Sequence, residues 1–500
     1  MWAKKYLTVV LVMLSFVIMA QHEDHTMCGV SIEDQQMMEK LYPTDARGFF
    51  NREDILYIPI KFHLTADSDG QGRLNDYFVL NQLCRLNTEF DSSGIQFYIY
   101  NGFNYLNNTN IYSAPANNNT QIVLKKDSKA LNVFITENAD TGSTGNGTTL
   151  GYYSPQGDYV IVRKAEFVKN SNTLSHEIGH FLSLRHTFYG WENKPYDKTL
   201  YGDTILFEKA PGNTTINIEV MNGSNCDNSA DNTCDTPPDY NFGLTASSCL
   251  FNQAVYDINR ERVRPMINNQ MGYFNDCNEY YFTDGQTLRM RNNFMSSGRA
   301  HLRHNYTPNT TYIEDAPVVT TPTQNQLIST YDRVFIDWDD VQGASMYLVE
   351  VRRSGVYYYS QVVTSSEITL TNLEKSFTYN AIIRPFNEVN TCTTSKTIVF
   401  KTGTSNFVGV NDVTQNTNLE LFPNPVIRGN NVNIHLSQEV QKVTDITVCN
   451  SMGQIIQNHK NPYEFGNGIF NISTSQMHQG MYYIKLQAGA TTLTSKLMVQ

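Results

Sequence analysis

Three histidines and one glutamate lie close together in the stretch LSHEIGHFLSLRHTF, which runs from Leu174 to Phe188. His176 and His180 are four residues apart, so on a helix they share one face and can bind one metal ion together. A catalytic zinc is held by about three protein ligands and keeps one position for water. Glu177, about 100° around the helix from His176, is placed to act as general base on that water. The stretch predicts a catalytic zinc site.

A third ligand from this stretch requires the helix to end soon after His180. At 1.5 Å per residue, a continuous helix would carry His186 about 9 Å further along, whereas zinc–nitrogen bonds are about 2.0–2.1 Å long. The chain must therefore leave the helix near Ser183 and double back if His186 is to bind the same ion. The alternative third ligand is a downstream acid, with Glu192 and Glu208 as the candidates.

The residues around this stretch have the mixed pattern of an α+β domain, with strands preceding the histidine helix. Apolar residues at helical spacing predict a helix over residues 76–90. Alternating or β-branched runs predict strands over residues 55–64, 94–100, 131–135 and 159–162.

HEIGHFLSLRHTF resembles the long zinc motif of the metzincins, and in particular that of the pappalysin (cytophagalysin) family. Three further blocks occur in the family's order: NTCDTPPD around Asp235, NNQMGYFNDC from Asn268 to Cys277, and YYFTDGQTLRMRNNF from Tyr280 to Phe294. The resemblance covers most of residues 50–305. It implies a metzincin-like catalytic domain that cleaves protein or peptide substrates as an endopeptidase, using one catalytic zinc.

The resemblance also assigns roles to single residues. His176, His180 and His186 are the implied zinc ligands, and Glu177 is the implied general base. Met271 corresponds to the methionine of the turn beneath the zinc. The alternatives are that Met271 is an ordinary core methionine, or that Met266 takes this role. Tyr273 corresponds to a tyrosine that hydrogen-bonds the tetrahedral intermediate, and a buried structural tyrosine is its alternative. Asp231 and Thr236 fall on positions that bind structural calcium, although a solvated, disulfide-pinned loop fits equally.

One position departs from the family motif, because Ser183 stands where metzincins have glycine. A residue other than glycine that is forced to positive φ costs about 1–2 kcal/mol. Structural zinc binding contributes on the order of 10 kcal/mol, so such strain is tolerable. Alternatively, Ser183 turns within the ordinary φ/ψ regions.

Eight cysteines fit an oxidising compartment. Four of them fall in one segment after the histidine stretch and predict two disulfides, with all three pairings open. Zinc binding by this cluster is the competing reading, but none of its spacings is the short CxxC type. These four are Cys226, Cys234, Cys249 and Cys277.

Cys28 lies between the N-terminal apolar run and the first predicted strand. A thiolate there could occupy the open position of the zinc, as in the cysteine switch known among metzincins, until residues 21–53 are removed. Cleavage near Arg47 or Arg52 would release the segment that carries Cys28. A disulfide between Cys28 and Cys84, or an unused thiol, are the alternatives.

The ends of the chain predict export. Residues 1–20 combine two lysines with a fifteen-residue apolar run, which predicts a signal peptide and is too short to span a bilayer comfortably. An uncleaved membrane anchor is the alternative, and we expect no transmembrane segment in the mature chain. The formal net charge of −11 argues against nucleic acid as a partner.

The C-terminal part is all-β in pattern. Trp338 and Tyr379 lie at positions that resemble the core tryptophan and the corner tyrosine of a fibronectin type III domain. LELFPNPV, ITVCNSMGQII, GMYYIKL and SKLMVQ, in this order, resemble the C-terminal sorting domain of type IX secretion. This resemblance implies the type IX machinery as a partner, and a location outside a Gram-negative cell or on its surface.

Together these features predict an α+β, metzincin-like catalytic domain followed by two small all-β sandwich domains, in a secreted zinc endopeptidase. The rival hypothesis is a non-catalytic surface adhesin or binding protein with a structural zinc. The expected boundaries are 1–20 for the signal peptide, 21–53 for a propeptide-like segment, 54–306 for the protease domain, 307–326 for a linker, 327–404 for the fibronectin-like domain and 405–500 for the sorting domain.

Overall fold

The computed structural model describes most of the chain, which forms two compact units, Met1–Thr404 and Ser405–Gln500. The described residues are 28–43, 54–139, 149–169, 171–246, 248–406, 419–436, 443–450, 453–460, 469–488 and 491–500. The predicted signal peptide and the expected cleavage sites at Arg47 and Arg52 lie outside them. No helix within these ranges has the length and apolar character needed to cross a membrane.

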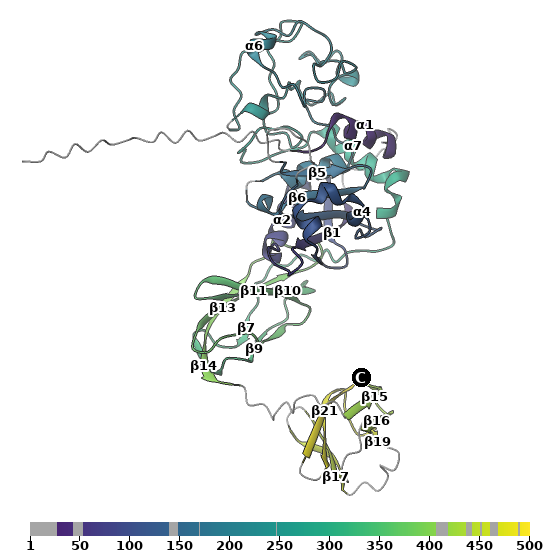
Figure 1. Cartoon of the computed structure of the whole chain (residues 1–500), viewed down its shortest axis with the longest axis vertical. Helices are drawn as coiled ribbons and strands as arrows, with labels where there is room; N and C mark the ends of the chain where they lie inside the picture. Colours follow the sequence, from purple (N-terminus) through teal and green to yellow (C-terminus); the bar gives the residue numbers. More distant parts are fainter. Residues whose placement is uncertain are drawn as a thin grey trace, which may run out of the picture. The chain divides into compact units, whose positions relative to one another are not determined.

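The first unit contains a six-stranded sheet in the order β2-β1-β4-β6-β5, with β3 also paired to β1 (Figure 1). All neighbouring pairs are parallel except β5–β6, which places an antiparallel strand at one edge. The strands are β1 (Leu56–Ala66), β2 (Ile95–Ile99), β3 (Asn104–Asn107), β4 (Leu131–Thr136), β5 (Gly151–Ser154) and β6 (Tyr159–Arg163). Alternation in the sequence predicted four of them but not the short β3 and β5.

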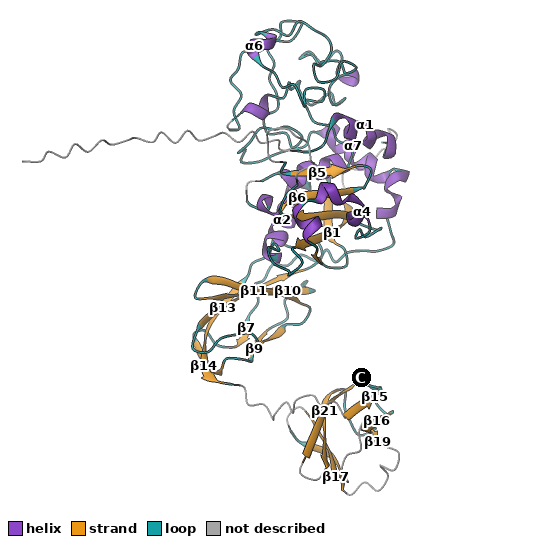
Figure 2. Ribbon diagram, in the orientation of Figure 1, coloured by secondary structure: helices purple, strands orange, loops and turns teal. Residues whose placement is uncertain are grey.

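Helices α2 and α5 pack against this sheet. Asn75 caps α2 by accepting from the backbone N–H of Tyr77, and the apolar face of the helix is buried in the core. Between α5 and α7 the chain is mostly loop, as Figure 2 shows. The helices of this part are α1 (Ile32–Leu41), α2 (Asp76–Glu89), α3 (Thr109–Ser113), α4 (Asn119–Val123), α5 (Thr173–Phe181), α6 (Lys198–Tyr201) and α7 (Asp284–Met295).

A fully buried arginine ties the end of α5 to the turn between β5 and β6. The Arg299 guanidinium forms an ion pair with Asp158 at 2.6 Å and donates to the carbonyl O of Phe181. Although burial opposes ionisation, Arg299 holds the pKa of the Asp158 carboxyl below its ordinary value. The ionised Asp158 carboxylate therefore stabilises the fold at pH values above about 3.9, its pKa in the unfolded chain. This stabilisation is lost as the pH falls through the lower pKa of the folded state.

Replacing Arg299 with methionine should lower the free energy of unfolding by about 3–5 kcal/mol, because it leaves the buried Asp158 charge unpaired. Denaturant unfolding at pH 7 measures this loss, and the same change at the exposed Arg264 serves as control. The difference between the two variants should shrink towards pH 3. Equal unfolding midpoints for both variants at pH 7 would contradict the assigned role of the pair.

Two sheets follow, in the orders β11-β10-β13-β14-β8 and β12-β9-β7. Trp338 lies in the core between them against Tyr347, and the Tyr379 hydroxyl accepts from the backbone N–H of Glu374, as a corner tyrosine does. The predicted linker over 307–326 contains β7. The strands are β7 (Val319–Thr321), β8 (Gln326–Thr330), β9 (Val334–Trp338), β10 (Met346–Arg353), β11 (Val356–Val363), β12 (Glu367–Leu370), β13 (Thr378–Phe386) and β14 (Lys396–Ser405).

The sandwich and the α+β part of the first unit are joined covalently. Cys84 on α2 forms a disulfide with Cys392, 308 residues further along the chain. The backbone N–H of Ile99 also donates to the carbonyl O of Glu388 at 2.8 Å. The alternative disulfide between Cys28 and Cys84 is therefore wrong, because the Cys84 sulfur already has a partner and Cys28 is a free thiol.

The second unit is a β-sandwich with its own core. Its two sheets have the orders β15-β16-β19 and β18-β17-β20-β21. The predicted fold class, α+β followed by small all-β domains, is confirmed. The strands are β15 (Leu419–Phe422), β16 (Asn431–Leu436), β17 (Val443–Asn450), β18 (Ile455–Lys460), β19 (Ile469–Ser473), β20 (Gly480–Ala488) and β21 (Thr491–Val499).

Candidate metal centre

Helix α5 ends at Phe181, and a left-handed turn at Ser183 sends the chain back towards the helix. Ser183 has φ 68°, the conformation that glycine adopts most easily. The backbone N–H of Leu184 donates to Gly179 O at 2.9 Å, which satisfies one of the carbonyls at the helix end. The serine therefore takes the strained turn instead of avoiding it.

This turn brings three buried imidazoles together. The ring centroids of His176 and His180 are 4.9 Å apart, and that of His186 is 5.3 Å from His176 and 4.6 Å from His180. Nε2 of His180 and Nε2 of His186 lie 3.1 Å apart. The helix supplies the first two rings and the return after Ser183 supplies the third.

Hydrogen bonds fix which nitrogen of each helix histidine faces the centre. Nδ1 of His176 lies 2.7 Å from the carbonyl O of Gln270, and Nδ1 of His180 lies 2.8 Å from that of Leu184. A carbonyl oxygen only accepts, so each Nδ1 carries the proton and each Nε2 keeps a free lone pair. Burial lowers the pKa of His176 to about 4 and holds the pKa values of His180 and His186 well below their ordinary value. All three rings are therefore neutral, as metal ligands must be.

Glu177 points into the same space from α5. Its side chain is fully buried; Oε2 lies 3.5 Å from the Cys28 sulfur, and Oε1 has no hydrogen-bond partner. Burial raises the pKa of this carboxyl to about 8. A carboxyl that exchanges its proton near neutral pH suits general acid and base work.

Cys28 enters the centre from the N-terminal segment. It forms a parallel bridge with Gly151 on the edge strand β5, where Gly29 N donates to Gly151 O at 2.9 Å. The ligand atoms of Cys28, His176, His180 and His186 all lie within 4.8 Å of one another. Burial and the Glu177 carboxylate raise the pKa of the Cys28 thiol, a shift that a bound cation opposes.

Met271 packs against α5, and Tyr273 packs against the rings of His176 and His186. Met271 is fully buried beneath α5, where a Cβ on Gly179 would come within 2.4 Å of the methionine sulfur. Gly179 is therefore the residue that lets this methionine approach the helix. The Tyr273 hydroxyl lies 3.4 Å from Nε2 of His186 and 3.4 Å from the carbonyl O of Cys28. Met266, the weaker rival, is only half-buried.

Glu192 lies behind His186 instead of among the ligand atoms. Its Oε1 is 3.4 Å from Nδ1 of His186 and 3.0 Å from Nε2 of Gln35. The Gln35 amide also lies 3.2 Å from Nδ1 of His186, and its oxygen accepts from the His186 backbone N–H at 2.9 Å. Sequence reasoning missed Gln35, and no spacing signal connects a residue 151 positions away with His186. Glu208 does not belong to the described ligand cluster.

The candidate calcium residues are not part of the histidine cluster. Thr236 Oγ1 is 3.0 Å from both carboxylate oxygens of Asp231, and both residues are buried. Glu219, which sequence reasoning missed, is buried nearby: burial and the Asp231 carboxylate raise its pKa to about 9. Burial raises the pKa of Asp231 to about 7. The Asp231 carboxylate thus opposes ionisation of Glu219, as a nearby like charge does.

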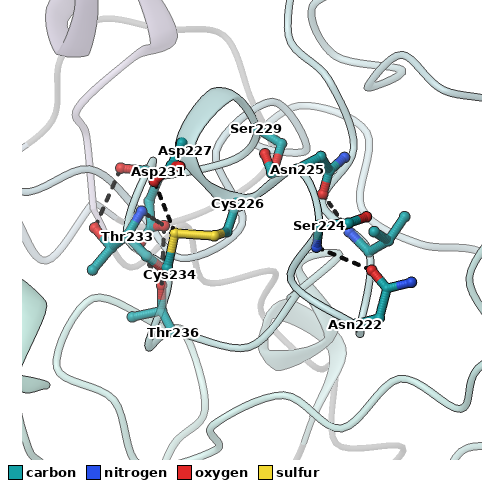
Figure 3. The surroundings of a disulfide bond; sticks show 11 residues. Asn222, Ser224, Asn225, Cys226, Asp227, Ser229, Asp231, Thr233, Cys234 and Thr236 are labelled. Atoms are coloured by element: carbon teal, nitrogen blue, oxygen red, sulfur yellow. Dashed lines mark hydrogen bonds between the residues drawn. A yellow bond between two sulfur atoms is a disulfide. The ribbon is translucent and has the colours of Figure 1, made fainter.

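Two disulfides pin the loops of this region. Cys226 pairs with Cys234 and Cys249 pairs with Cys277, so the sequence cluster forms two bridges instead of a zinc site. Figure 3 shows Asp231, Thr233 and Thr236 beside the Cys226–Cys234 bridge. A bridge that closes an eight-residue separation holds this short loop in place.

The donor set fits a zinc ion. Nε2 of His176 is buried without any hydrogen-bond partner, and buried polar atoms of this kind are rare unless a ligand satisfies them. Three neutral imidazoles and one sulfur, all within reach of a common point, are the N and S ligands that zinc prefers in tetrahedral sites.

Two histidines on α5 and a third on the return after Ser183 thus lie close to one another, beside a glutamate on that helix, as residues that could hold a metal ion. Residues 114–204, which include α5 and all three histidines, match the family model described as pregnancy-associated plasma protein-A, a peptidase M43 family. Residues 420–500 match the secretion system C-terminal sorting domain. The predicted resemblances to the pappalysin family and to the type IX sorting domain are confirmed, and the first match supports a metalloprotease.

Comparison with solved structures finds fibronectin type III domains. One is FN3tt, with 20% identity over 17% of this chain and 95% of that one, at a TM-score of 0.15. Another comprises fibronectin(III)-like modules of Clostridium thermocellum CbhA, with 11% identity over 37% of this chain and 94% of that one, at a TM-score of 0.14. The fn3 domain of human collagen alpha-1(XX) has 18% identity over 21% of this chain and 92% of that one, at a TM-score of 0.14. Comparison with curated proteins finds no match.

Proposed function

We propose that this protein is a secreted zinc endopeptidase and that the uncut chain, with Cys28 in the metal centre, is its latent form. The observation that carries the proposal is the convergence of His176, His180 and His186, with an unpartnered Nε2 on His176 and with Glu177 beside them. A pre-formed cluster of neutral imidazoles, each backed by a fixed hydrogen bond, matches the design of metal sites in which outer partners orient the ligands.

The residues around the cluster divide the work of peptide hydrolysis. Zinc, when bound by the three histidines, supplies Lewis-acid chemistry and makes water a nucleophile near neutral pH. Glu177 takes the proton of the attacking water and returns it to the leaving amine. The Tyr273 hydroxyl donates to the oxygen that becomes negative, and Met271 supports α5 from below. Burial of all these groups strengthens each of these interactions.

The rival function is that of a non-catalytic surface adhesin or binding protein with a structural metal. The glutamate separates the two. A structural site has no use for a carboxylate whose oxygen is buried beside the ligands without a partner, since that arrangement costs free energy. The position of Glu177 therefore favours the enzyme.

Metal removal tests the proposal. The full chain should be used after removal of the N-terminal segment, because a catalytic fragment would leave Cys84 without Cys392. EDTA should abolish casein cleavage, and zinc should restore it. Calcium should raise the melting temperature without restoring cleavage, because ligand binding stabilises the folded state, and Asp231→Asn should remove only the calcium effect. Full cleavage in metal-free protein would overturn the proposal.

We further propose that Cys28 enforces latency. Its sulfur lies within the ligand cluster and its backbone pairs with the edge strand β5, so residues 28–29 occupy space that an extended peptide would need. Removal of the segment between the signal peptide and β1 would free both. Calcium binding by Asp231 and Thr236, with Glu219 as a further ligand, would stabilise the disulfide-pinned loops.

The sorting-domain match suggests secretion or attachment to the cell surface. We propose that the chain passes through the periplasm and leaves a Gram-negative cell by type IX secretion, whose machinery would be the partner of residues 420–500. Deletion of this part should leave the protein in the periplasm, and its appearance in the medium at the parent level would refute this route.

A further inference from the structure

The N-terminal segment touches the catalytic region at a second place, separate from the Cys28 contact. Helix α1 rests on a surface that we call the α1-binding surface, formed by the turn after α5 and one side of α7. It consists of Ser183, Arg185, Arg289 and Asn293.

Charge pairing is the first component of this contact. The two carboxylate oxygens of Glu39 pair separately with Arg185 and Arg289, and both arginine side chains are largely buried. No other carboxylate among the described residues forms an ion pair with either arginine. Partly buried, charge-assisted hydrogen bonds of this kind are stronger than exposed ion pairs. The surface is therefore built for an acidic partner.

The second component recognises the end of a helix. Tyr42 caps the C-terminus of α1, and its carbonyl O accepts from Asn293 Nδ2 at 2.9 Å and from Ser183 Oγ at 3.3 Å. Asn293 Nδ2 also donates to Ser183 Oγ at 2.6 Å, and Arg289 Nε donates to Ser183 O at 2.8 Å. The last carbonyls of a helix lack partners within the helix. A glycine at position 183 would lack the hydroxyl, so the departure from the family motif has a function here.

The third component is the buried face of α1. Met38 and Gln35 are fully buried, and Gln35 reaches the backbone N–H of His186. The helix is also encoded locally, because Ser31 and Asp34 form a capping box at its start. A ten-residue helix is nevertheless marginal in water on its own. Packing on this surface is therefore what orders it.

We propose that the α1-binding surface holds the segment of residues 28–43 independently of Cys28, so that the segment still binds after it has been cut from the chain. The α1-binding surface provides the affinity for the segment, and Cys28 blocks the metal centre. If the proposed function is correct, the released segment is then an inhibitor in trans. It is an acidic helical peptide that is exported together with the enzyme it inhibits.

Fluorescence anisotropy tests the binding without any assay of activity, so it is independent of the proposed function. The full chain is cut at a protease site introduced within residues 44–53, and its own segment is removed. A labelled peptide of residues 28–43 carrying Cys28→Ser should bind. Glu39→Gln in this peptide should weaken binding at least tenfold, whereas Glu33→Gln, on the exposed side of the same helix, should change it less than twofold. Ser183→Gly in the protein should also weaken it.

The proposal is overturned if only peptides with an intact Cys28 bind, or if the two glutamate changes have equal effects. A second measurement avoids the need to cut the chain. In the intact chain carrying Cys28→Ser, amide hydrogen exchange in α1 should stay slow and should become fast when Glu39→Gln is added. Fast exchange in α1 of the Cys28→Ser variant alone would equally refute the proposal.

Discussion

Replacing Glu177 with glutamine should lower the rate of casein cleavage by about 10²–10⁴-fold, the usual contribution of a general base, and should leave the bound zinc in place. Glutamine preserves the shape of the side chain but cannot accept the proton of the attacking water. Since Glu177 is not among the four residues whose ligand atoms converge, its charge is not needed to hold the ion. Turnover of the processed chain, together with zinc content by mass spectrometry, measures both effects.

Glu166 offers a matched control for this change. It precedes α5 and accepts from the Thr173 hydroxyl at the start of that helix, and it is not part of the ligand cluster. Glu166→Gln should therefore leave turnover within a few-fold of the parent. Parental turnover in Glu177→Gln would disprove the mechanism. Loss of both zinc and activity would instead assign Glu177 a structural role and favour the non-catalytic rival.

Replacing Cys28 with alanine should make the uncut precursor active, with casein cleavage at least tenfold above that of the parent precursor. The change removes the only sulfur in the described ligand cluster, so the position that it occupied opens to water. Activity should remain below that of a chain from which the segment has been cut and removed, because helix α1 still holds the segment near the centre. Both precursors should carry a cleavage-resistant segment 44–53 so that processing cannot contribute.

Cys449 provides the control for this experiment, because it is the other free and buried thiol among the described residues and lies in the second unit. A Cys449→Ala precursor should stay as inactive as the parent. If the Cys28→Ala precursor is inactive but becomes active once the segment is cut and removed, the thiol is not what keeps the precursor latent. Latency would then rest on the backbone pairing of residues 28–29 with β5.

The sequence alone determined the features that depend on local spacing. His176 and His180 share a helix face because their spacing matches the helical repeat, and the distance to His186 required a turn near Ser183. The sequence also indicated the α+β order of the first part of the chain, the two β-sandwiches and the paired cysteines after the histidines. These inferences hold because helix and strand periods act over a few residues and need no knowledge of what packs against them.

Only the tertiary structure decided the contacts between distant segments. It placed Cys28 in the histidine cluster, joined Cys84 to Cys392 and set Gln35 behind His186. It also chose between the two conformations open to Ser183, because the partners that hold its left-handed turn come from α1 and α7. Such contacts depend on which surfaces meet after the chain has folded, and the pairing of surfaces leaves no periodic trace in the sequence.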